Sequence, residues 1–130
     1  MALSATLTHV RIFKTKYFSK WASKERLTDK SLKAAVGEVE DGLVDAHLGG
    51  YLVKKRVAIP GKGKSGSTRT ILAIKSGEHA FFVYGFAKNA RSNISSEELR
   101  ALKLIAKELL GYRGKSLEQV LSSGALVEVK

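Results

Sequence analysis

The sequence contains no cysteine and only three histidines. Without cysteine the chain has no disulfide bonds, thiolate metal ligands or cysteine nucleophiles, which is compatible with a reducing compartment. His9, His47 and His79 lie in a ragged start, beside a glycine turn and at a strand edge. They have no metal-ligand spacing and form no evident pair with each other or with a carboxylate. Histidine-based acid–base catalysis, metal binding and a bound cofactor are therefore not expected.

Long apolar runs are also absent. The opening MALSATLTHVRIFKTK has no apolar segment of signal-peptide length, and no later run approaches the roughly 18 residues of a membrane span. We therefore expect a cytoplasmic protein that is neither exported nor embedded in a membrane.

Acidic residues are few, with 12 Asp or Glu against 23 Lys or Arg and a formal net charge of +11. The segment from Lys54 to Arg91 contains nine of the basic residues and only one acidic residue, Glu78, so it carries +8 of that charge. Charge concentrated in this way indicates a polyanionic partner. Charge alone does not separate nucleic acid from an anionic membrane surface or an acidic protein.

The 130 residues and the 44% apolar content indicate one globular domain over residues 1–130. Apolar periodicity predicts a short helix around residues 17–22 and a second that Thr28 or Asp29 caps. Ser95 and Glu98 form a capping-box pattern before a third helix with a continuous apolar stripe. A short fourth helix follows around residues 117–121, with Ser116 as its cap.

Strand-like patterns alternate with glycine-rich turns. Short strands are predicted at residues 10–13 and 125–129, and longer ones at 51–59, 68–75 and 79–86. The three longer strands indicate a small antiparallel meander, and the whole pattern is of the α+β class.

Two sets of side chains have alternative interpretations. The outer face of the second helix is expected to carry an acidic patch that is solvated rather than a metal or acid–base site, made of Glu38, Glu40, Asp41 and Asp45. The aromatic group of Tyr17, Phe18 and Trp21 is expected to pack against the sheet, with base stacking by Trp21 or Tyr17 as the alternative.

Period-2 alternation places Lys54 and Arg56 on one face of the 51–59 strand and Lys55 on the other. The following loop, Pro60 to Arg69, combines cations with glycines that suit phosphate contacts, although it lacks the spacing of a Walker loop. Any catalysis must then use Lys, Arg or Tyr without a metal. Seven cations are candidates: Lys54, Arg56, Lys62, Lys64, Arg69, Lys88 and Arg91. A basic face that binds nucleic acid without cutting it explains the spacing as well.

The run KKRVAIPGKGKSGSTRTILAIKSGEHAFFVYGFAKNARSNIS contains K-x-R-x-x-x-x-G-x-G-K-S-G-x-x-R followed by Y-x-F-A-K-N. This arrangement resembles the core of the RelE/HigB-type toxins of bacterial toxin–antitoxin modules. FKTKYFSKWASKERLTDKSL, the GLVDAHLGG turn and ELRALKLIAKELL extend the resemblance over roughly residues 10–128.

The resemblance implies N-terminal helices on a small, curved, mainly antiparallel sheet with a C-terminal helix, the RelE-like microbial ribonuclease type of fold. It also implies a bacterial cytoplasmic endoribonuclease that cleaves mRNA on the ribosome, with the 2′-hydroxyl as nucleophile. Five residues would then be catalytic: Lys54, Arg56, Arg69, Lys88 and Arg91. Three would bind RNA: Lys55, Lys62 and Lys64.

Within that set, Lys54 and Arg56 would contact the backbone or activate the hydroxyl, and Arg69 would stabilise the phosphate. A cognate antitoxin of the helix-turn-helix type would mask the basic cleft. The catalytic tyrosine or histidine near the C-terminus of some relatives has no secure counterpart; Tyr112 is available just beyond a helix, and Tyr84 is expected in the core. The alternative function is a non-catalytic nucleic-acid-binding module or a gyrase-directed toxin of the same fold.

Overall fold

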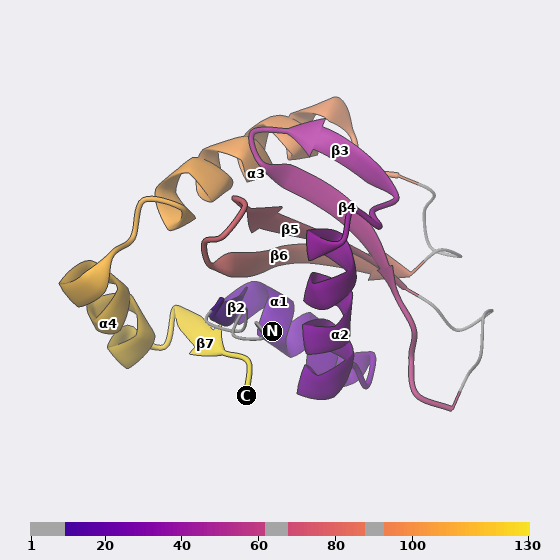
Figure 1. The fold of residues 1–130 in the computed structure, drawn as a ribbon, viewed down its shortest axis with the longest axis horizontal. Helices are drawn as coiled ribbons and strands as arrows, with labels where there is room; N and C mark the ends of the chain where they lie inside the picture. The colour runs from indigo at the N-terminus through magenta and orange to yellow at the C-terminus, as the bar shows by residue number, and fades with distance from the viewer. Residues whose placement is uncertain (1–9, 62–67, 88–92) are drawn as a thin grey trace, which may run out of the picture.

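The computed structural model describes residues 10–61, 68–87 and 93–130, which form four helices and one six-stranded sheet (Figure 1). The helices are α1 (Lys16–Lys24), α2 (Asp29–Glu40), α3 (Ser96–Leu109) and α4 (Gly114–Ser123). The strands are β2 (Ile12–Thr15), β3 (Ala46–Gly49), β4 (Leu52–Val57), β5 (Thr68–Ile74), β6 (Ala80–Ala87) and β7 (Leu126–Glu128). The predicted α+β class is confirmed, and no helix in these ranges is long and apolar enough to cross a bilayer.

The sheet separates two apolar clusters, so the molecule has three layers. On one face α1 and α2 pack against the sheet through residues such as Phe18, Leu32 and Phe82. On the other face α3 and α4 pack against it through residues such as Leu102 and Phe81. Alternate residues of β4 and β5 thus enter different clusters, as a period of two requires. In β6 a register shift places the consecutive residues Val83 and Tyr84 in the same cluster.

The strand order is β3-β4-β5-β6-β2-β7. The predicted meander is confirmed, since β4 pairs with β5 and β5 with β6 in antiparallel register. The β2–β6 pairing is parallel, a feature that local patterns in the sequence do not predict. Strand β2 therefore lies between β6 and β7, although β7 is at the other end of the chain (Figure 1).

Part of the GLVDAHLGG segment, which was expected to be a turn, forms strand β3. It pairs with β4 through a two-residue connection, Gly50 and Tyr51, in which both residues have positive φ (61° and 66°). Positive φ at both positions is the mark of a type I′ hairpin turn, whose twist suits a sheet. A tyrosine is uncommon in this conformation. The sequence therefore gives no sign of a turn at Tyr51, and the strand was predicted to start at that residue.

Two of the predicted helix starts are confirmed, those of α2 and α3. Thr28 caps α2 by accepting a hydrogen bond from the Ser31 N–H, and Ser95 with Glu98 forms a complete capping box on α3. Helix α4 begins earlier than predicted, at Gly114. The Ser116 hydroxyl instead bonds both the backbone N–H and the carbonyl of Arg113.

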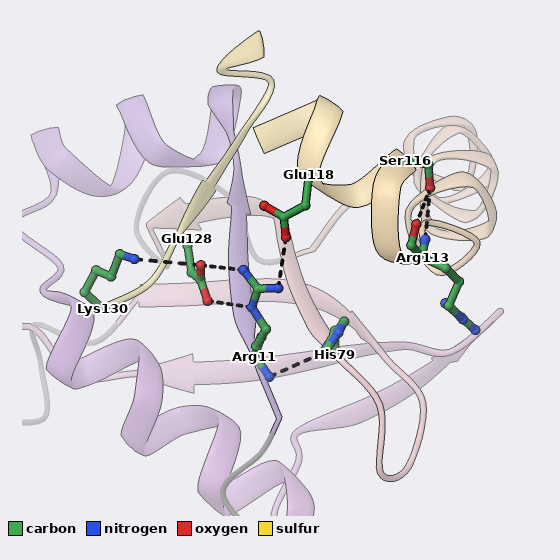
Figure 2. A network of polar contacts seen from close by, with 7 residues as sticks. All are labelled: Arg11, His79, Arg113, Ser116, Glu118, Glu128 and Lys130. Carbon is green, nitrogen blue, oxygen red and sulfur yellow. Dashed lines mark hydrogen bonds and ion pairs between the residues drawn. The ribbon is translucent and has the colours of Figure 1, made fainter. Parts of the chain in front are cut away.

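A polar network joins the two ends of the described chain (Figure 2). The Arg11 guanidinium donates two hydrogen bonds of 2.9 and 2.8 Å to the Glu128 carboxylate and reaches Glu118 at 3.4 Å. These bonds lower the pKa of Glu128 below its ordinary value. The Arg11 backbone N–H donates to His79 Nδ1 at 3.3 Å. The network therefore holds the segment before β2 against β7 and the start of β6.

Candidate functional site

The sheet brings three of the predicted site residues together on one face. Arg56 of β4 lies directly opposite Arg69 of β5, and Lys54 lies opposite Ile71 on the same face. Arg69 in turn lies opposite Phe86, and Ile71 opposite Tyr84. We call Lys54, Arg56 and Arg69 the cation cluster. It lies on the face that carries α3.

The three cations differ in their surroundings. The Arg56 side chain is 58% exposed, whereas that of Arg69 is 12% exposed. No ion pair to Lys54 is found within the described ranges, so its ammonium is uncompensated there. Cations gathered at the ends of two strands give this face a strongly positive potential, which attracts phosphates.

One carboxylate, that of Asp45, lies between the two arginines. Its Oδ2 is 3.8 Å from Arg56 Nε and 4.0 Å from Arg69 Nε, and the side chain is 24% exposed. Asp45 was expected on the solvated outer face of α2. The residue is exposed, as expected, but it lies beyond the end of α2 and beside the cations of β4 and β5. The residue immediately precedes β3, and the sequence interpretation had no strand there to bring it beside β4.

Arg69 has a buried nitrogen, Nη1, without a hydrogen-bond partner among the described atoms. A buried donor left without a partner costs about 1–3 kcal/mol. A buried group of this kind in a native structure has an explanation such as local strain, a catalytic role, or a bound water or ion. A phosphate oxygen has the charge and the geometry to accept this hydrogen bond, since Arg binds phosphates through paired N–H groups.

Lys55 points to the opposite face, as its position in the alternation predicts. Its side chain is 10% exposed and its ammonium lies 2.7 Å from Glu38 Oε1 and 2.9 Å from the Leu43 carbonyl. These contacts join β4 to α2 and to the segment after it. Lys55 was expected to bind RNA. The structure places it apart from the cation cluster, with its ammonium buried against Glu38 and the Leu43 carbonyl.

The other predicted cations, Lys62, Lys64, Lys88 and Arg91, lie outside the described residues. The strands next to those positions are described, and their ends are neighbours. Thr68 at the start of β5 lies opposite both Val57 at the end of β4 and Ala87 at the end of β6.

Tyr84 lies on the strand next to the cation cluster, opposite Ile71, and contacts a second tyrosine, Tyr17 of α1. Tyr84, which was expected in the core, is only partly buried, and its hydroxyl donates to Glu98 Oε2 at 3.2 Å. Its ring lies nearly parallel to that of Tyr17, at an interplanar angle of 5° and a centroid distance of 6.0 Å. Tyr17 is 58% exposed. An exposed aromatic ring beside a basic surface can stack on a nucleobase.

The remaining candidate groups lie elsewhere. Tyr112 follows the far end of α3, about 20 Å along that helix from Glu98. Its hydroxyl donates to Glu108, which raises the pKa of Tyr112 above its ordinary value. His79 is bonded to Arg11. No group of three or more His, Asp or Glu side chains suited to a metal is present in the described part of the chain.

The cation cluster can therefore bind a phosphodiester through two guanidinium groups and one ammonium. The position of Asp45 and the stacking of Tyr17 on Tyr84 are the parts that sequence patterns missed, although stacking of a base on Tyr17 was an alternative there. Asp45 depends on the β3–β4 pairing, and the exposure of Tyr17 depends on where α1 leaves β2. A predicted hairpin after Asp45 would have been the signal for the first, whereas no local signal exists for the second.

A family model described as the RelE toxin of the RelE / RelB toxin–antitoxin system matches residues 10–129 of this sequence. The match spans α1 to α4 and all six described strands. No curated protein sequence matches the chain.

Proposed function

The chain belongs to the family of RelE toxins of toxin–antitoxin systems, and on this basis we propose that it is an endoribonuclease that cleaves mRNA on the ribosome. Toxins of this family are generally endoribonucleases that inhibit translation. The observation that supports the proposal most directly is the cation cluster. It combines Lys54 with the cross-strand pair of Arg56 and Arg69 on one face of the sheet.

The proposed reaction uses the substrate's own 2′-hydroxyl. Its oxygen bonds to the adjacent phosphorus, the bond from phosphorus to the 5′-oxygen breaks, and a 2′,3′-cyclic phosphate forms. One proton leaves the 2′-hydroxyl and one is added to the departing 5′-oxygen. Because charge accumulates on the phosphate oxygens, preorganised guanidinium groups stabilise the transition state more than the ground state.

Each member of the cation cluster has a role in this proposal. Arg69, with its unpaired buried Nη1, binds a non-bridging phosphate oxygen, and Arg56 binds the same phosphate from the more exposed side. Lys54 is the one amine of the three and contacts the 2′-hydroxyl, because a guanidinium does not give up its proton in proteins. Lys88 and Arg91 complete the catalytic set, and Lys62 and Lys64 hold the RNA, as the resemblance implies.

Membership of the family implies an antitoxin partner. We infer that this antitoxin is a helix-turn-helix protein that covers the cation cluster with acidic side chains. Complementary charge would make this complex, like RNA binding, weaken as the salt concentration rises.

The deciding experiment is expression of the chain from an inducible promoter without its antitoxin. We expect growth arrest and, by primer extension, cuts within translated codons that disappear when initiation is blocked. Purified protein should cleave mRNA on programmed ribosomes equally well in EDTA-treated and magnesium-matched reactions, with the ribosomes held intact by polyamine. Growth arrest without any mRNA cut would instead support a gyrase-directed toxin, and neither effect would support a non-catalytic binding module.

A further inference from the structure

The two arginines of the cation cluster present an electrostatic problem. Like charges directly opposite each other on neighbouring strands repel and destabilise the pairing. Arg56 and Arg69 occupy such a position. The carboxylate of Asp45, 3.8 Å from one Nε and 4.0 Å from the other, is the group placed to offset this repulsion.

Asp45 is held in place by the backbone rather than by the arginines. Its N–H donates to the Lys54 carbonyl at 2.9 Å. Two residues earlier, the Leu43 carbonyl accepts from the Lys55 ammonium, which is also paired with Glu38. Consecutive residues of β4 thus fix the segment before β3, one through its carbonyl and the next through its side chain. The backbone of Asp45 is consequently fixed beside β4, which keeps its carboxylate near both guanidinium groups.

The distances leave the arginines able to bind a ligand. At 3.8 and 4.0 Å the contacts are longer than hydrogen bonds, which lie at 2.7–3.2 Å for N–H···O. Both contacts are made by Nε, so the terminal nitrogens are not occupied by Asp45. Arg69 Nη1 remains buried and unpaired in the described structure.

We propose that Asp45 is a positioning residue that orients Arg56 and Arg69 toward a single phosphate of the RNA. The proposal rests on the ribonuclease function proposed above. Asp45 itself touches neither the RNA nor the reacting atoms. The negative charge of Asp45 repels the RNA phosphates. If Asp45 nevertheless raises the cleavage rate, it does so by orienting the two arginines.

Loss of the Asp45 charge should therefore change RNA affinity and cleavage rate in different ways. In Asp45→Asn the affinity for ribosome-bound mRNA should be unchanged or higher, because a negative charge has been removed from a basic surface. The single-turnover cleavage rate at saturating ribosomes should fall about 10- to 100-fold, since small misplacements of catalytic groups have effects of this size. Asp45→Glu should recover part of the rate.

The matched control is Asp41→Asn, which removes the same charge from an exposed residue four positions earlier. It should cleave at the wild-type rate. A double-mutant comparison adds a second criterion: in an Arg69→Ala background, Asp45→Asn should cause no further loss, because the group that it positions is absent. In nitrogen-15 spectra the Nε–H signals assigned to Arg56 and Arg69 should broaden in Asp45→Asn, whereas the Arg11 Nε–H signal, held by Glu128, should not change.

The outcomes separate this inference from the function on which it rests. If the wild-type chain cuts mRNA, Arg69→Ala does not, and Asp45→Asn cuts at the wild-type rate, the positioning role is wrong and the ribonuclease function stands. If affinity and rate fall together while the Nε–H signals stay sharp, the positioning role is also wrong. If the wild-type chain does not cut mRNA at all, both proposals are overturned.

Discussion

The indole ring of Trp21 lies directly over Gly85, in the space that a side chain at position 85 would occupy. Trp21 belongs to α1 and Gly85 to β6, so this contact sets how closely the helix approaches the strand. Packing against the sheet, rather than base stacking, is therefore the role of Trp21, as expected from the sequence.

Gly85→Ala should destabilise the protein by about 1–3 kcal/mol, because the added methyl group would overlap the indole and force α1 away from the sheet. Chemical denaturation of the purified variant measures this loss. Trp21→Leu in the same chain should recover part of it by making room for the methyl group. Gly37→Ala is the control, since nothing lies within 4 Å of a methyl group there. A Gly85→Ala variant as stable as the wild type would contradict this account.

Arg69→Ala should lower mRNA cleavage about 100- to 1,000-fold with little change in the unfolding midpoint, because it removes a preorganised charge at the phosphate. Arg69→Lys should not restore the rate, since an ammonium cannot donate the paired hydrogen bonds of a guanidinium. Lys107→Ala, which removes one exposed charge from the last turn of α3, is the charge-matched control. Undiminished cleavage by Arg69→Ala would remove Arg69 from the site.

Lys55→Met should affect stability rather than RNA binding. The variant leaves Glu38 and the Leu43 carbonyl without their partner, at a cost of about 1–3 kcal/mol. Below its melting temperature it should retain the wild-type affinity for RNA and the wild-type dependence on salt. A shallower salt dependence of binding would show instead that Lys55 contacts a phosphate.

Tyr17 and Tyr51 provide a matched pair for testing base stacking, because they are 58% and 57% exposed. Tyr17 lies beside the cation cluster through Tyr84, whereas Tyr51 lies in the β3–β4 turn. Tyr17→Ala should weaken RNA binding by about 1–3 kcal/mol, the usual contribution of one stacked base. Tyr51→Ala should bind like the wild type. Equal affinities for both variants and the wild type would exclude stacking by Tyr17.

Stability should fall in two stages as the pH is lowered. Burial, followed by the positive charges of Arg11 and Arg113, lowers the pKa of His79 in the folded protein. The contribution of His79 to folding stability is therefore complete above the pKa of an unfolded histidine, near 6.5. It is lost as the pH falls below that value, because protonation removes the acceptor of the Arg11 N–H. The pKa of Glu128 is also lowered, by hydrogen bonds from Arg11. Its contribution is lost only as the pH falls below about 4.5.

Denaturant titrations at pH 7.5, 5.5 and 3.5 separate the two stages. His79→Gln should flatten the change between pH 7.5 and 5.5 and leave the change below pH 4.5. Glu128→Gln should reduce the lower stage alone. His47→Gln, which alters an exposed histidine on β3, should keep both stages. If His79→Gln retains the upper stage, the Arg11–His79 contact does not contribute to it.

The sequence patterns predict the parts of the fold that repeat locally. Alternation in β4 places Lys54 and Arg56 on the face opposite to Lys55. This is confirmed, since Lys55 contacts Glu38 and Leu43 on the α2 side of the sheet. The Ser95–Glu98 capping box is likewise confirmed, since all of its hydrogen bonds are made within four residues.

What the patterns miss depends on contacts between distant residues. Strand β3 has only partly buried and exposed residues, so it lacks the apolar signal of a strand and is defined by its pairing with β4. The position of Asp45 follows from that pairing. Ile105 belongs to the predicted apolar stripe of α3 but is 42% exposed, because α3 meets the sheet along a narrower line than the stripe suggests.

The position of β2 between β6 and β7 has a consequence for synthesis of the chain. Residues 12–15 are made early, yet their partners, residues 80–82 and 126–128, are made much later. Long-range pairing of this kind forms slowly, whereas β4, β5 and β6 follow one another and can pair as soon as they are made. During translation β4 can therefore pair with β5, which brings Arg56 opposite Arg69, before β7 has been made and has paired with β2. A chain still attached to the ribosome carries this part of the site before its sheet is complete.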